Sequence, residues 1–343
     1  MSVREAIATA VAGDEVPGGV LEEAFGAIAD GKATSLQIAA LLVALRTKGE
    51  TVGEIVATAR ALRARAAGSP PPAPDAVDTC GTGGDGAGTF NISTAAAFVA
   101  AGAGVCVAKH GNRAASSRTG SFDVLEALGV EIDLTVEQSA EILSEVGIGA
   151  FFARTAHPAM RFVAPVRQEL GIRTLMNCLG PLLNPVGVRH QLVGVYDGAL
   201  VEPLARALGE LGARRALVVH GADGLDEITT TTSTQAALLE NGRVSALTIR
   251  PEELGVERVA PESLAGGDAE ENAKIVKSVL QGEPGAPRDI VVLNAAGALW
   301  AAGAVSGLVQ GVEAAGESID SGRARAKLDA LIAATRARRG ASP

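Results

Sequence analysis

The chain has 343 residues, of which 47% are hydrophobic and 20% charged, so it can bury a large core and lacks the composition of a disordered protein. A net charge of −9 argues against a nucleic-acid-binding protein, which needs a basic face to displace counterions. The three cysteines form no C-x-x-C pair, no signal-peptide pattern opens the chain, and no apolar run reaches about 18 residues. We therefore expect a cytoplasmic protein that binds neither nucleic acid nor membrane.

Residues 1–66 carry the periodicity of amphipathic helices. Apolar residues recur at spacings of three and four, first as Leu36, Ala39, Ala40 and Val43, then as Ile55, Ala59 and Leu62. Thr34 with Gln37 and Thr51 with Glu54 are capping-box pairs that predict two helix starts, and Gly49 between them is typical of a helix stop. We expect a small helical domain over residues 1–68, whose apolar faces pack together or against a second subunit.

A proline-rich connector, GSPPPAPD at residues 68–75, follows this helical unit and is stiff because proline fixes φ. Beyond it, short runs rich in Val and Ile alternate with helical segments, and a strand pair flanks the Asn241-Gly242 turn. This alternation predicts an α/β domain over residues 75–343 with a mostly parallel central sheet flanked by helices. Strands are expected at residues 77–80, 105–108, 150–153, 192–196, 216–220 and 290–294.

The first predicted strand ends in a glycine-dense loop, GTGGDGAG at residues 81–88. Residues without Cβ let main-chain N–H groups approach a ligand closely, and phosphate is the ligand that such a nest of donors favours. The loop runs into Thr89, Asn91, Ser93 and Thr94, just before an Ala-rich helix. Because helix N-termini attract anions, this segment is typical of a phosphate site.

A second donor loop, KHGNR at residues 109–113, follows the next predicted strand and continues through Ser116, Ser117 and Ser121. No Asp or Glu occurs between Gly86 and Ser121, although the chain as a whole is acidic. Two donor loops at the ends of successive strands can hold one polyanion from two sides.

Two other interpretations of the glycine loop remain open. Gly81, Gly83 and Gly86 match the dinucleotide pattern G-x-G-x-x-G, but the acidic residue expected about 20 positions later is missing until Asp123. A glycine-rich turn without any ligand would explain the glycines. It would not explain the Lys, Asn, Ser and Thr donors that accompany them.

Charged residues elsewhere complete the candidate site. Asp226 and Glu227 follow the strand expected at residues 216–220, and paired carboxylates suit Mg²⁺, which usually enters with substrate phosphates. A helix cap or turn is the commoner role for such a stretch, but the acid-free donor segment favours the metal. Arg167 is the best candidate to grip a carboxylate through two parallel hydrogen bonds. Arg161 and Arg173 are its rivals, and a surface ion pair is the alternative for all three.

Several motifs, in this order, resemble the anthranilate phosphoribosyltransferase family. They lie at residues 81–85, 91–94 and 109–129, and continue as GIRTLMNCLGPLLNP at 171–185, QLVGVY at 191–196 and VHGADGLDEIT at 219–229. The resemblance implies a Mg²⁺-dependent enzyme that joins anthranilate to 5-phospho-α-D-ribose 1-diphosphate and releases diphosphate, the second step of tryptophan biosynthesis. It also implies a homodimer, and a segment around 165–190 that crosses back to the helical domain.

The resemblance also assigns residues to three ligands, without a general acid or base. Anthranilate would contact Gly81, Asn112, His157 and Arg167, and Ser93, Asp226 and Glu227 would hold Mg²⁺, with two ions per active site. The sugar diphosphate would contact Gly81, Gly84, Asp85, Thr89, Asn91, Ile92, Ser93, Thr94, Lys109, His110, Gly111, Asn112, Arg113, Ser116, Ser117 and Ser121.

The sequence departs from the family pattern at Phe122, at residues 153–155, at Met176 and at Leu183. None of these changes removes a predicted ligand-binding residue, so they bear on pocket shape. Two rival functions are a pyrimidine nucleoside phosphorylase, which shares the fold, and a non-catalytic nucleic-acid-binding relative. The pair Asp226 and Glu227 and the GPLLNP segment favour the transferase over the phosphorylase, and the acidic charge argues against the binding protein.

Overall fold

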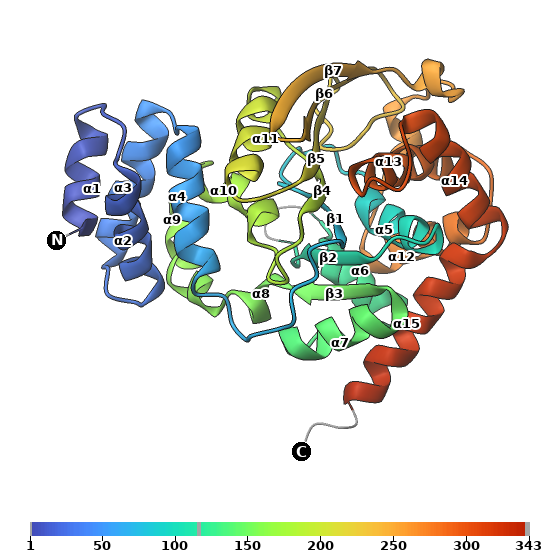
Figure 1. The fold of residues 1–343 in the computed structure, drawn as a ribbon, viewed down its shortest axis with the longest axis horizontal. Helices are drawn as coiled ribbons and strands as arrows, with labels where there is room; N and C mark the ends of the chain where they lie inside the picture. Colours follow the sequence, from blue (N-terminus) through green and yellow to red (C-terminus); the bar gives the residue numbers. More distant parts are fainter. Residues whose placement is uncertain (1, 115–117, 340–343) are drawn as a thin grey trace.

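The computed structural model describes residues 2–114 and 118–339. Its N-terminal helices are α1 (Ser2–Val11), α2 (Gly18–Ala29), α3 (Ser35–Lys48) and α4 (Val52–Arg63), and they lie at one end of the molecule (Figure 1). Both predicted capping boxes are present, since the Thr34 hydroxyl accepts from the Gln37 N–H and the Thr51 hydroxyl from the Glu54 N–H. Helices α3 and α4 therefore begin where the capping pattern predicted.

The buried face of α3 differs from the predicted one. The residues that α3 buries most deeply are Ile38, Leu41, Leu42 and Leu45. Leu36 is 83% exposed and Val43 37%, so of the two predicted alternatives this series does not pack within the helical unit, and packing against a second subunit stays a prediction. Apolar residues surround most of this helix, and spacing alone cannot rank two apolar faces of one helix.

A seven-stranded sheet forms the centre of the second part, in the order β3-β2-β1-β4-β5-β6-β7. Its strands are β1 (Val77–Gly81), β2 (Val107–Gly111), β3 (Ile148–Phe152), β4 (His190–Gly194), β5 (Arg215–Gly221), β6 (Thr234–Glu240) and β7 (Arg243–Ile249). All pairs among β1 to β5 are parallel, whereas β6 pairs antiparallel with β5, and β7 pairs antiparallel with β6. The predicted fold class, a helical part followed by a mostly parallel sheet flanked by helices, is confirmed.

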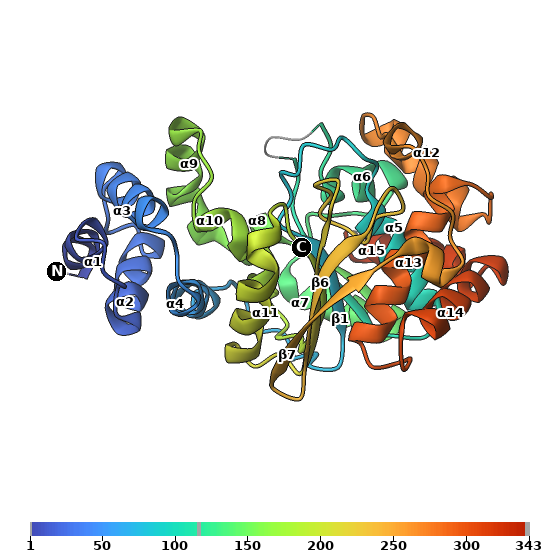
Figure 2. The same ribbon diagram turned by 90° about the horizontal axis from the view of Figure 1, so that it is seen from above.

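Helices cover both faces of the sheet, and neighbouring strand residues point to opposite faces. Leu192 and Leu217 belong to the apolar cluster with α5 (Ile92–Gly102) and α13 (Ala286–Ala301), while Val193 and Val218 belong to the cluster with α11 (Val201–Glu210). The first cluster also includes residues of α6 (Ser121–Leu128), α12 (Ala269–Leu280), α14 (Leu308–Asp320) and α15 (Arg323–Arg339) (Figure 2). Helix α7 (Val136–Val146) packs beside β3.

Residues 290–294, predicted as a strand, lie inside α13. This helix begins after Gly285 and carries Pro287 in its first turn, a placement that favours helix starts. It packs against α5 and α14 and is buried on nearly every side. A short window of such a helix has no polar face, and its apolar run cannot be told from a buried strand by periodicity.

After β3 and the short α8 (Ala153–Ala156), the chain returns to the N-terminal helices. This stretch contains η1 (Pro158–Phe162), α9 (Ala164–Leu170), α10 (Met176–Leu179) and η2 (Gly180–Leu183). Helix α9 contacts α3, and η2 contacts α4. Val163, Val166 and Leu179 join the apolar cluster of the N-terminal helices. The division into domains 1–68 and 75–343, joined in space around 165–190, stays a prediction.

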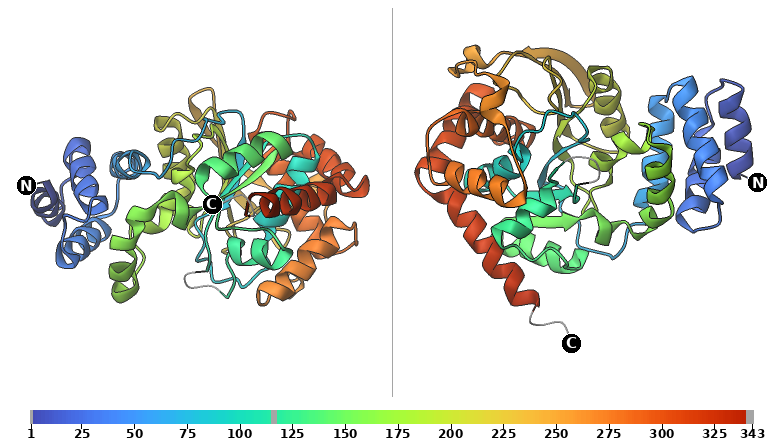
Figure 3. Two further views of the ribbon diagram at one scale, coloured as in Figure 1. Left: turned by 90° about the horizontal axis from the view of Figure 1, so that it is seen from below. Right: turned by 180° about the vertical axis from the view of Figure 1, so that it is seen from behind.

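Helix α15 lies on the far side of the sheet from α1 (Figure 3). Its arginines form surface ion pairs, in which Arg338 contacts Glu141 and Glu145 and Arg339 contacts Glu131. Of the helices within residues 2–114 and 118–339, none combines the length and apolar character needed to cross a membrane.

Candidate active site

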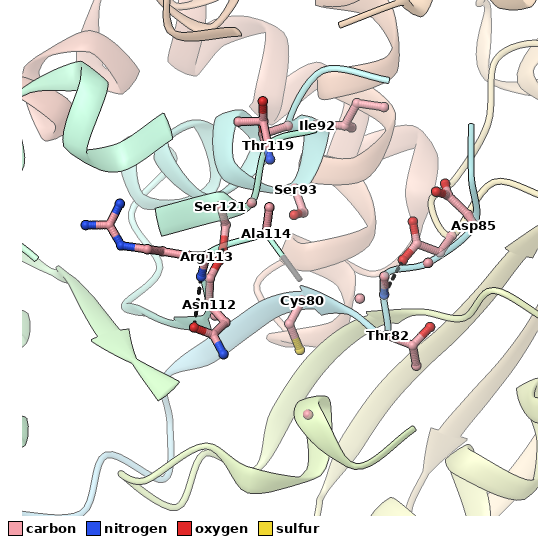
Figure 4. A pocket seen from close by; sticks show the side chains of 18 of the residues that line it. Cys80, Thr82, Asp85, Ile92, Ser93, Asn112, Arg113, Ala114, Thr119 and Ser121 are labelled. Atoms are coloured by element: carbon pink, nitrogen blue, oxygen red, sulfur yellow. Dashed lines mark hydrogen bonds between the residues drawn. The ribbon is translucent and has the colours of Figure 1, made fainter. Parts of the chain in front are cut away.

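A cavity of about 430 Å³ opens at the carboxyl ends of β1 and β2. From β1 the chain proceeds to β2 and β3 on one side, whereas β4 and β5 lie on the other. The cavity therefore lies where the strand order reverses, the usual place for a ligand in a parallel sheet. Figure 4 shows Thr82 and Asp85 on one side of it and Asn112 and Ser121 on another.

The glycine loop lines the cavity with main chain. Gly83, Gly84, Gly86 and Gly88 have φ values from 65° to 78°, a left-handed conformation that favours glycine. The Gly83 N–H donates to Asp226 Oδ2 at 2.9 Å. A Cβ on Gly81 would lie 2.5 Å from the same oxygen, so glycine at position 81 lets the carboxylate approach the loop.

The N-terminus of α5 forms the next wall. Asn91, Ile92 and Ser93 line the cavity, and the Ser93 N–H donates to Glu227 Oε1 at 3.1 Å. Thr94 points elsewhere: it is fully buried, and its hydroxyl has no hydrogen-bond partner among the described residues. The N-terminal end of α5 therefore borders the cavity, and the partial positive charge of a helix N-terminus favours anions there.

Lys109, on β2, is 3% exposed. Its Nζ donates to the Thr79 carbonyl at 2.7 Å and to Ser93 Oγ at 3.4 Å. Burial lowers the pKa of Lys109, while the charge of Asp78 acts in the opposite direction. The ammonium group thus links β1 to the start of α5 and contributes positive charge to the cavity wall.

The second donor loop follows β2. Ser121 Oγ donates to the Asn112 carbonyl at 3.3 Å, and both residues line the cavity. The Arg113 guanidinium pairs with Asp123 and Glu126 at 3.0 and 2.8 Å and points away from Ser93 and Asp85 in Figure 4. The predicted Ser116 and Ser117 lie outside the described residues.

Asp226 and Glu227 reach the cavity from the loop after β5. Burial raises the pKa of Asp226 to about 7, with the charge of Asp85 adding to the effect. Burial also raises the pKa of Glu227 well above its ordinary value, and Asp226 adds to that shift. A divalent cation would relieve this concentration of negative charge, so these residues fit Mg²⁺.

The carboxylates do not form a complete metal cage. Within the part of the chain that the structure describes, no three His, Cys, Asp or Glu side chains come together as a metal site. Mg²⁺ usually keeps several water ligands and takes others from substrate phosphates. Two carboxylates beside an anion-binding loop are therefore a suitable partial ligand set.

Arg167, on α9, also lines the cavity, together with Ala153, Met176, Asn177 and Gly180. Burial lowers the pKa of Arg167. This side of the cavity joins a guanidinium to small and apolar residues, a combination that suits a carboxylate attached to an apolar ring.

The cavity wall does not include the other residues considered for this side of the site, which are His157, Arg161 and Arg173. His157 does not line the cavity: its Nε2 is 2.7 Å from the Leu183 carbonyl, and its ring lies edge-on to His110 with centroids 5.3 Å apart. Arg161 stacks on Phe162. Arg173 stacks on Tyr196 and donates to the Gly84 carbonyl. Of the three arginines weighed from the sequence, Arg167 is the one in the cavity wall.

Comparison with known proteins places the chain in a family. Residues 4–66 match the helical bundle domain, and residues 73–325 the a/b domain, of a glycosyl transferase family. A protein of Rubrobacter xylanophilus named anthranilate phosphoribosyltransferase is 54% identical over 97% of this chain and 98% of its own length. One of Symbiobacterium thermophilum with the same name is 55% identical over 90% of this chain and 91% of its own.

The chain belongs to the anthranilate phosphoribosyltransferase family. The crystal structure of the Thermus thermophilus member has 44% identity and a TM-score of 0.92, covering 97% of this chain and 99% of that one. The Saccharomyces cerevisiae member, solved with PRPP and Mg, has 28% identity and a TM-score of 0.84, covering 93% of each chain.

Two of the departures from the anthranilate phosphoribosyltransferase pattern lie outside the cavity wall. Phe122 is fully buried and stacks on Phe152 with centroids 4.9 Å apart, and Leu183 is buried beside His157. Ala153 and Met176 reach the cavity wall. These two positions are therefore where this member's pocket shape can differ.

Sequence reasoning missed several residues of the wall. Those not assigned to a ligand were Cys80, Thr82, Gly83, Gly88, Phe90, Ala114, Arg118, Thr119, Gly120, Ala153, Met176, Asn177, Gly180, Gly267 and Asn272. Some of them, such as Arg118 and Thr119, lie inside the acid-free segment, which was a usable signal. Gly267 and Asn272 are remote in sequence and carried none.

Proposed function

We propose that the chain transfers the phosphoribosyl group of 5-phospho-α-D-ribose 1-diphosphate to the amine of anthranilate. The products are N-(5-phosphoribosyl)anthranilate and diphosphate, in L-tryptophan biosynthesis. One observation carries the proposal: the phosphate-type loops and the metal-type carboxylates are in direct contact. The Gly83 N–H donates to the Asp226 carboxylate, and the Ser93 N–H donates to the Glu227 carboxylate. A diphosphate bridged by Mg²⁺ needs anion donors and metal ligands at this proximity.

The sugar diphosphate binds along the glycine loop, the start of α5 and the second donor loop. The proposed contacts are Gly81, Gly84, Asp85, Thr89, Asn91, Ile92, Ser93, Lys109, His110, Gly111, Asn112, Arg113 and Ser121, all of which line the cavity. Ser116 and Ser117 complete the proposal from outside the described residues. Thr94, buried in α5, acts from behind as a packing residue.

Anthranilate binds on the side of α9 and α10, with its carboxylate on Arg167. Gly81 and Asn112 lie at the boundary between the two substrates, and His157 supports this wall through its contact with His110. A structure of the Saccharomyces cerevisiae enzyme in complex with 4-fluoroanthranilate, at 27% identity and a TM-score of 0.84, supports a substrate of this class. The amine would then face the ribose carbon that loses diphosphate.

Ser93, Asp226 and Glu227 would hold Mg²⁺, with two ions per active site. The bound cation would supply positive charge to the diphosphate as it leaves. The raised pKa values of Asp226 and Glu227 support this role. Burial and mutual repulsion disfavour the two negative charges, and a bound cation would compensate for them. The yeast complex with PRPP and Mg supports the choice of metal.

The protein's part in the reaction is electrostatic and positional. Breaking the bond to diphosphate leaves positive charge on the ribose ring carbon and negative charge on the leaving oxygens. Lys109, next to Ser93, and the partial positive charge of the α5 N-terminus stabilise the negative charge that develops on those oxygens. Arg167 aligns the amine by holding the carboxylate of the same ring. The mechanism uses no dedicated side-chain base.

The test is the loss of anthranilate fluorescence when protein, Mg²⁺ and the sugar diphosphate are mixed. We expect turnover that stops when a chelator removes the metal. Cleavage of thymidine or uridine in phosphate without Mg²⁺, and no consumption of anthranilate, would instead favour the pyrimidine nucleoside phosphorylase. A gel shift of single-stranded DNA without turnover would favour the nucleic-acid-binding relative.

The proposal extends to the setting of the enzyme. We place it in the cytoplasm as a homodimer formed through the helical part. Leu36 and Val43 lie one above the other on the outward side of α3 and are exposed. An apolar stripe of this kind supports a subunit contact.

A further inference from the structure

Asn91 is the N-cap residue of α5, yet its side chain does not cap the helix. An N-cap Asn ordinarily accepts a hydrogen bond from the second or third N–H of its own helix. Here Asn91 Oδ1 accepts from Asn272 Nδ2 at 3.0 Å, across 181 residues of sequence. The Ser93 N–H, in the first turn of α5, donates to Glu227 and not to the Asn91 side chain.

A chain of hydrogen bonds determines which way both amides point. The Gly267 N–H, which can only donate, bonds to Asn272 Oδ1 at 2.7 Å. The NH₂ group of Asn272 must then face Asn91, and because it too can only donate, it meets the Asn91 oxygen. The Asn91 NH₂ group, at Nδ2, is then the last group in this chain of hydrogen bonds. Among the described residues, no hydrogen bond donated by this group is found.

The support for Asn272 is rigid. The residue is 1% exposed and yet lines the cavity with Asn91. The segment before it is tied to the loop that carries Asn91, since the Phe90 N–H donates to the Leu264 carbonyl and the Gly266 N–H to the Gly88 carbonyl. A buried amide with both ends engaged cannot rotate without losing a hydrogen bond.

We propose that Asn272 is a positioning residue of the sugar-diphosphate site. It holds the Asn91 amide with Nδ2 toward the cavity, where this group donates to a phosphate oxygen of the substrate. The inference rests on the proposed function, because it takes the anion to bind in this cavity. Asn272 itself acts only through Asn91.

The test compares Asn91→Ala, Asn272→Ala and the double variant. The measurements are the KM of each substrate and, by calorimetry, the Kd of the sugar diphosphate with Mg²⁺ alone. A hydrogen bond to a charged acceptor is worth a factor of about ten or more. We expect Asn91→Ala and Asn272→Ala each to raise the KM and Kd of the sugar diphosphate about tenfold, with the KM of anthranilate nearly unchanged. The double variant should be no weaker than Asn91→Ala.

Asn272→Asp separates orientation from packing. The carboxylate keeps the shape of the side chain and still accepts from Gly267, but it cannot donate to Asn91. Asn91 must then turn its NH₂ group inward and present its oxygen to the phosphate. We expect Asn272→Asp to weaken sugar-diphosphate binding at least as much as Asn272→Ala.

A matched control removes a buried hydrogen bond elsewhere on α5. Ser318 Oγ donates to the Val99 carbonyl at 2.8 Å, near the C-terminal end of that helix. Ser318→Ala should lower the melting temperature and leave the KM of the sugar diphosphate unchanged. Additive effects of Asn91→Ala and Asn272→Ala, or an Asn272→Ala variant with a lower melting temperature and an unchanged Kd, would overturn the inference.

The outcomes separate this inference from the proposed function. If the unaltered protein consumes anthranilate but Asn272→Ala binds the sugar diphosphate normally, the function holds and the positioning role is wrong. If the unaltered protein binds the sugar diphosphate without consuming anthranilate, and Asn272→Ala weakens that binding, the function is wrong and the positioning role holds.

Discussion

Glu227 shows how single residues prepare the cavity for a cation. Its carboxylate accepts from the Ser93 N–H, and burial together with the neighbouring Asp226 raises its pKa well above its ordinary value. The folded protein therefore holds negative charge that it stabilises poorly by itself. Binding of a divalent cation would make this arrangement favourable.

Glu227→Gln should reduce turnover severely while leaving the fold intact. The amide keeps the size of the side chain but loses the charge that holds the metal, a change we expect to lower kcat by about 10² to 10³. The fluorescence assay over a range of Mg²⁺ concentrations measures it, with thermal unfolding as the check on folding. Glu240→Gln, which removes a surface ion pair with Arg215, should leave kcat unchanged. Undiminished activity of Glu227→Gln would refute the metal assignment.

Arg167→Ala should raise the KM of anthranilate by about ten- to a hundredfold, because a two-pronged hydrogen bond to a carboxylate is lost. The KM of the sugar diphosphate should change far less and serves as the internal reference. Arg167→Lys keeps the charge without the planar fork and should restore only part of the affinity. The reverse pattern, a larger change in the KM of the sugar diphosphate, would mean that another residue binds the anthranilate carboxylate.

At this scale the sequence was most informative where residues are close along the chain. The donors from Thr89 to Ser93 and from Lys109 to Asn112 could be predicted because glycines and an absence of acids mark them. Asn272 could not, since its partner Asn91 is 181 residues away. His157 was assigned to a ligand through resemblance; its ring lies edge-on to His110, outside the cavity wall, and its role stays a prediction.

Among the elements, the glycine loop depends on its neighbours for its position. Arg173, between α9 and α10, stacks 3.9 Å from the centroid of Tyr196 and donates to the Gly84 carbonyl. Thr82 accepts from the Tyr196 N–H at 3.0 Å and donates its own N–H to the Gly194 carbonyl. The loop after β1 is therefore fastened both to β4 and to the stretch that carries Arg167.

Arg173→Ala should loosen the loop and raise the KM of the sugar diphosphate about tenfold, since a cation–π contact and a hydrogen bond are lost together. Steady-state kinetics and hydrogen exchange of the Gly83 and Gly84 amides measure the change. Arg161→Ala is the matched control, because Arg161 stacks on Phe162 at 4.7 Å and contacts another segment. If both variants behave alike, the clamp has no role in binding.

Element prediction succeeded where local signals are strong and failed where burial erases them. The capping boxes of α3 and α4 form as expected, because each depends on side chains three residues apart. The strand expected at residues 290–294 is part of α13, whose partners α5 and α14 surround it. The sequence could not tell which face of α3 points inward, because both of its faces are apolar.

For the whole molecule, the exposed apolar residues of α3 bear on assembly. We expect a homodimer, and Leu36→Asp combined with Val43→Asp should convert it to a monomer by placing charges on the outward side of α3. Size-exclusion chromatography with light scattering measures the mass. Val309→Asp is the control, because Val309 is 58% exposed on α14, away from α3 (Figure 1). A monomeric unaltered protein would show this subunit contact to be wrong.

One apolar cluster joins residues of α1 to α4 with Val166, Leu179, Val193 and Val218. The N-terminal helices and one side of the sheet thus exclude water together rather than as two separate cores. Heating should therefore melt both in one cooperative transition, whatever freedom the connector at residues 68–75 has. A fragment starting after the connector would expose this apolar surface to water and aggregate. We therefore do not expect the α/β part to remain folded and in solution by itself.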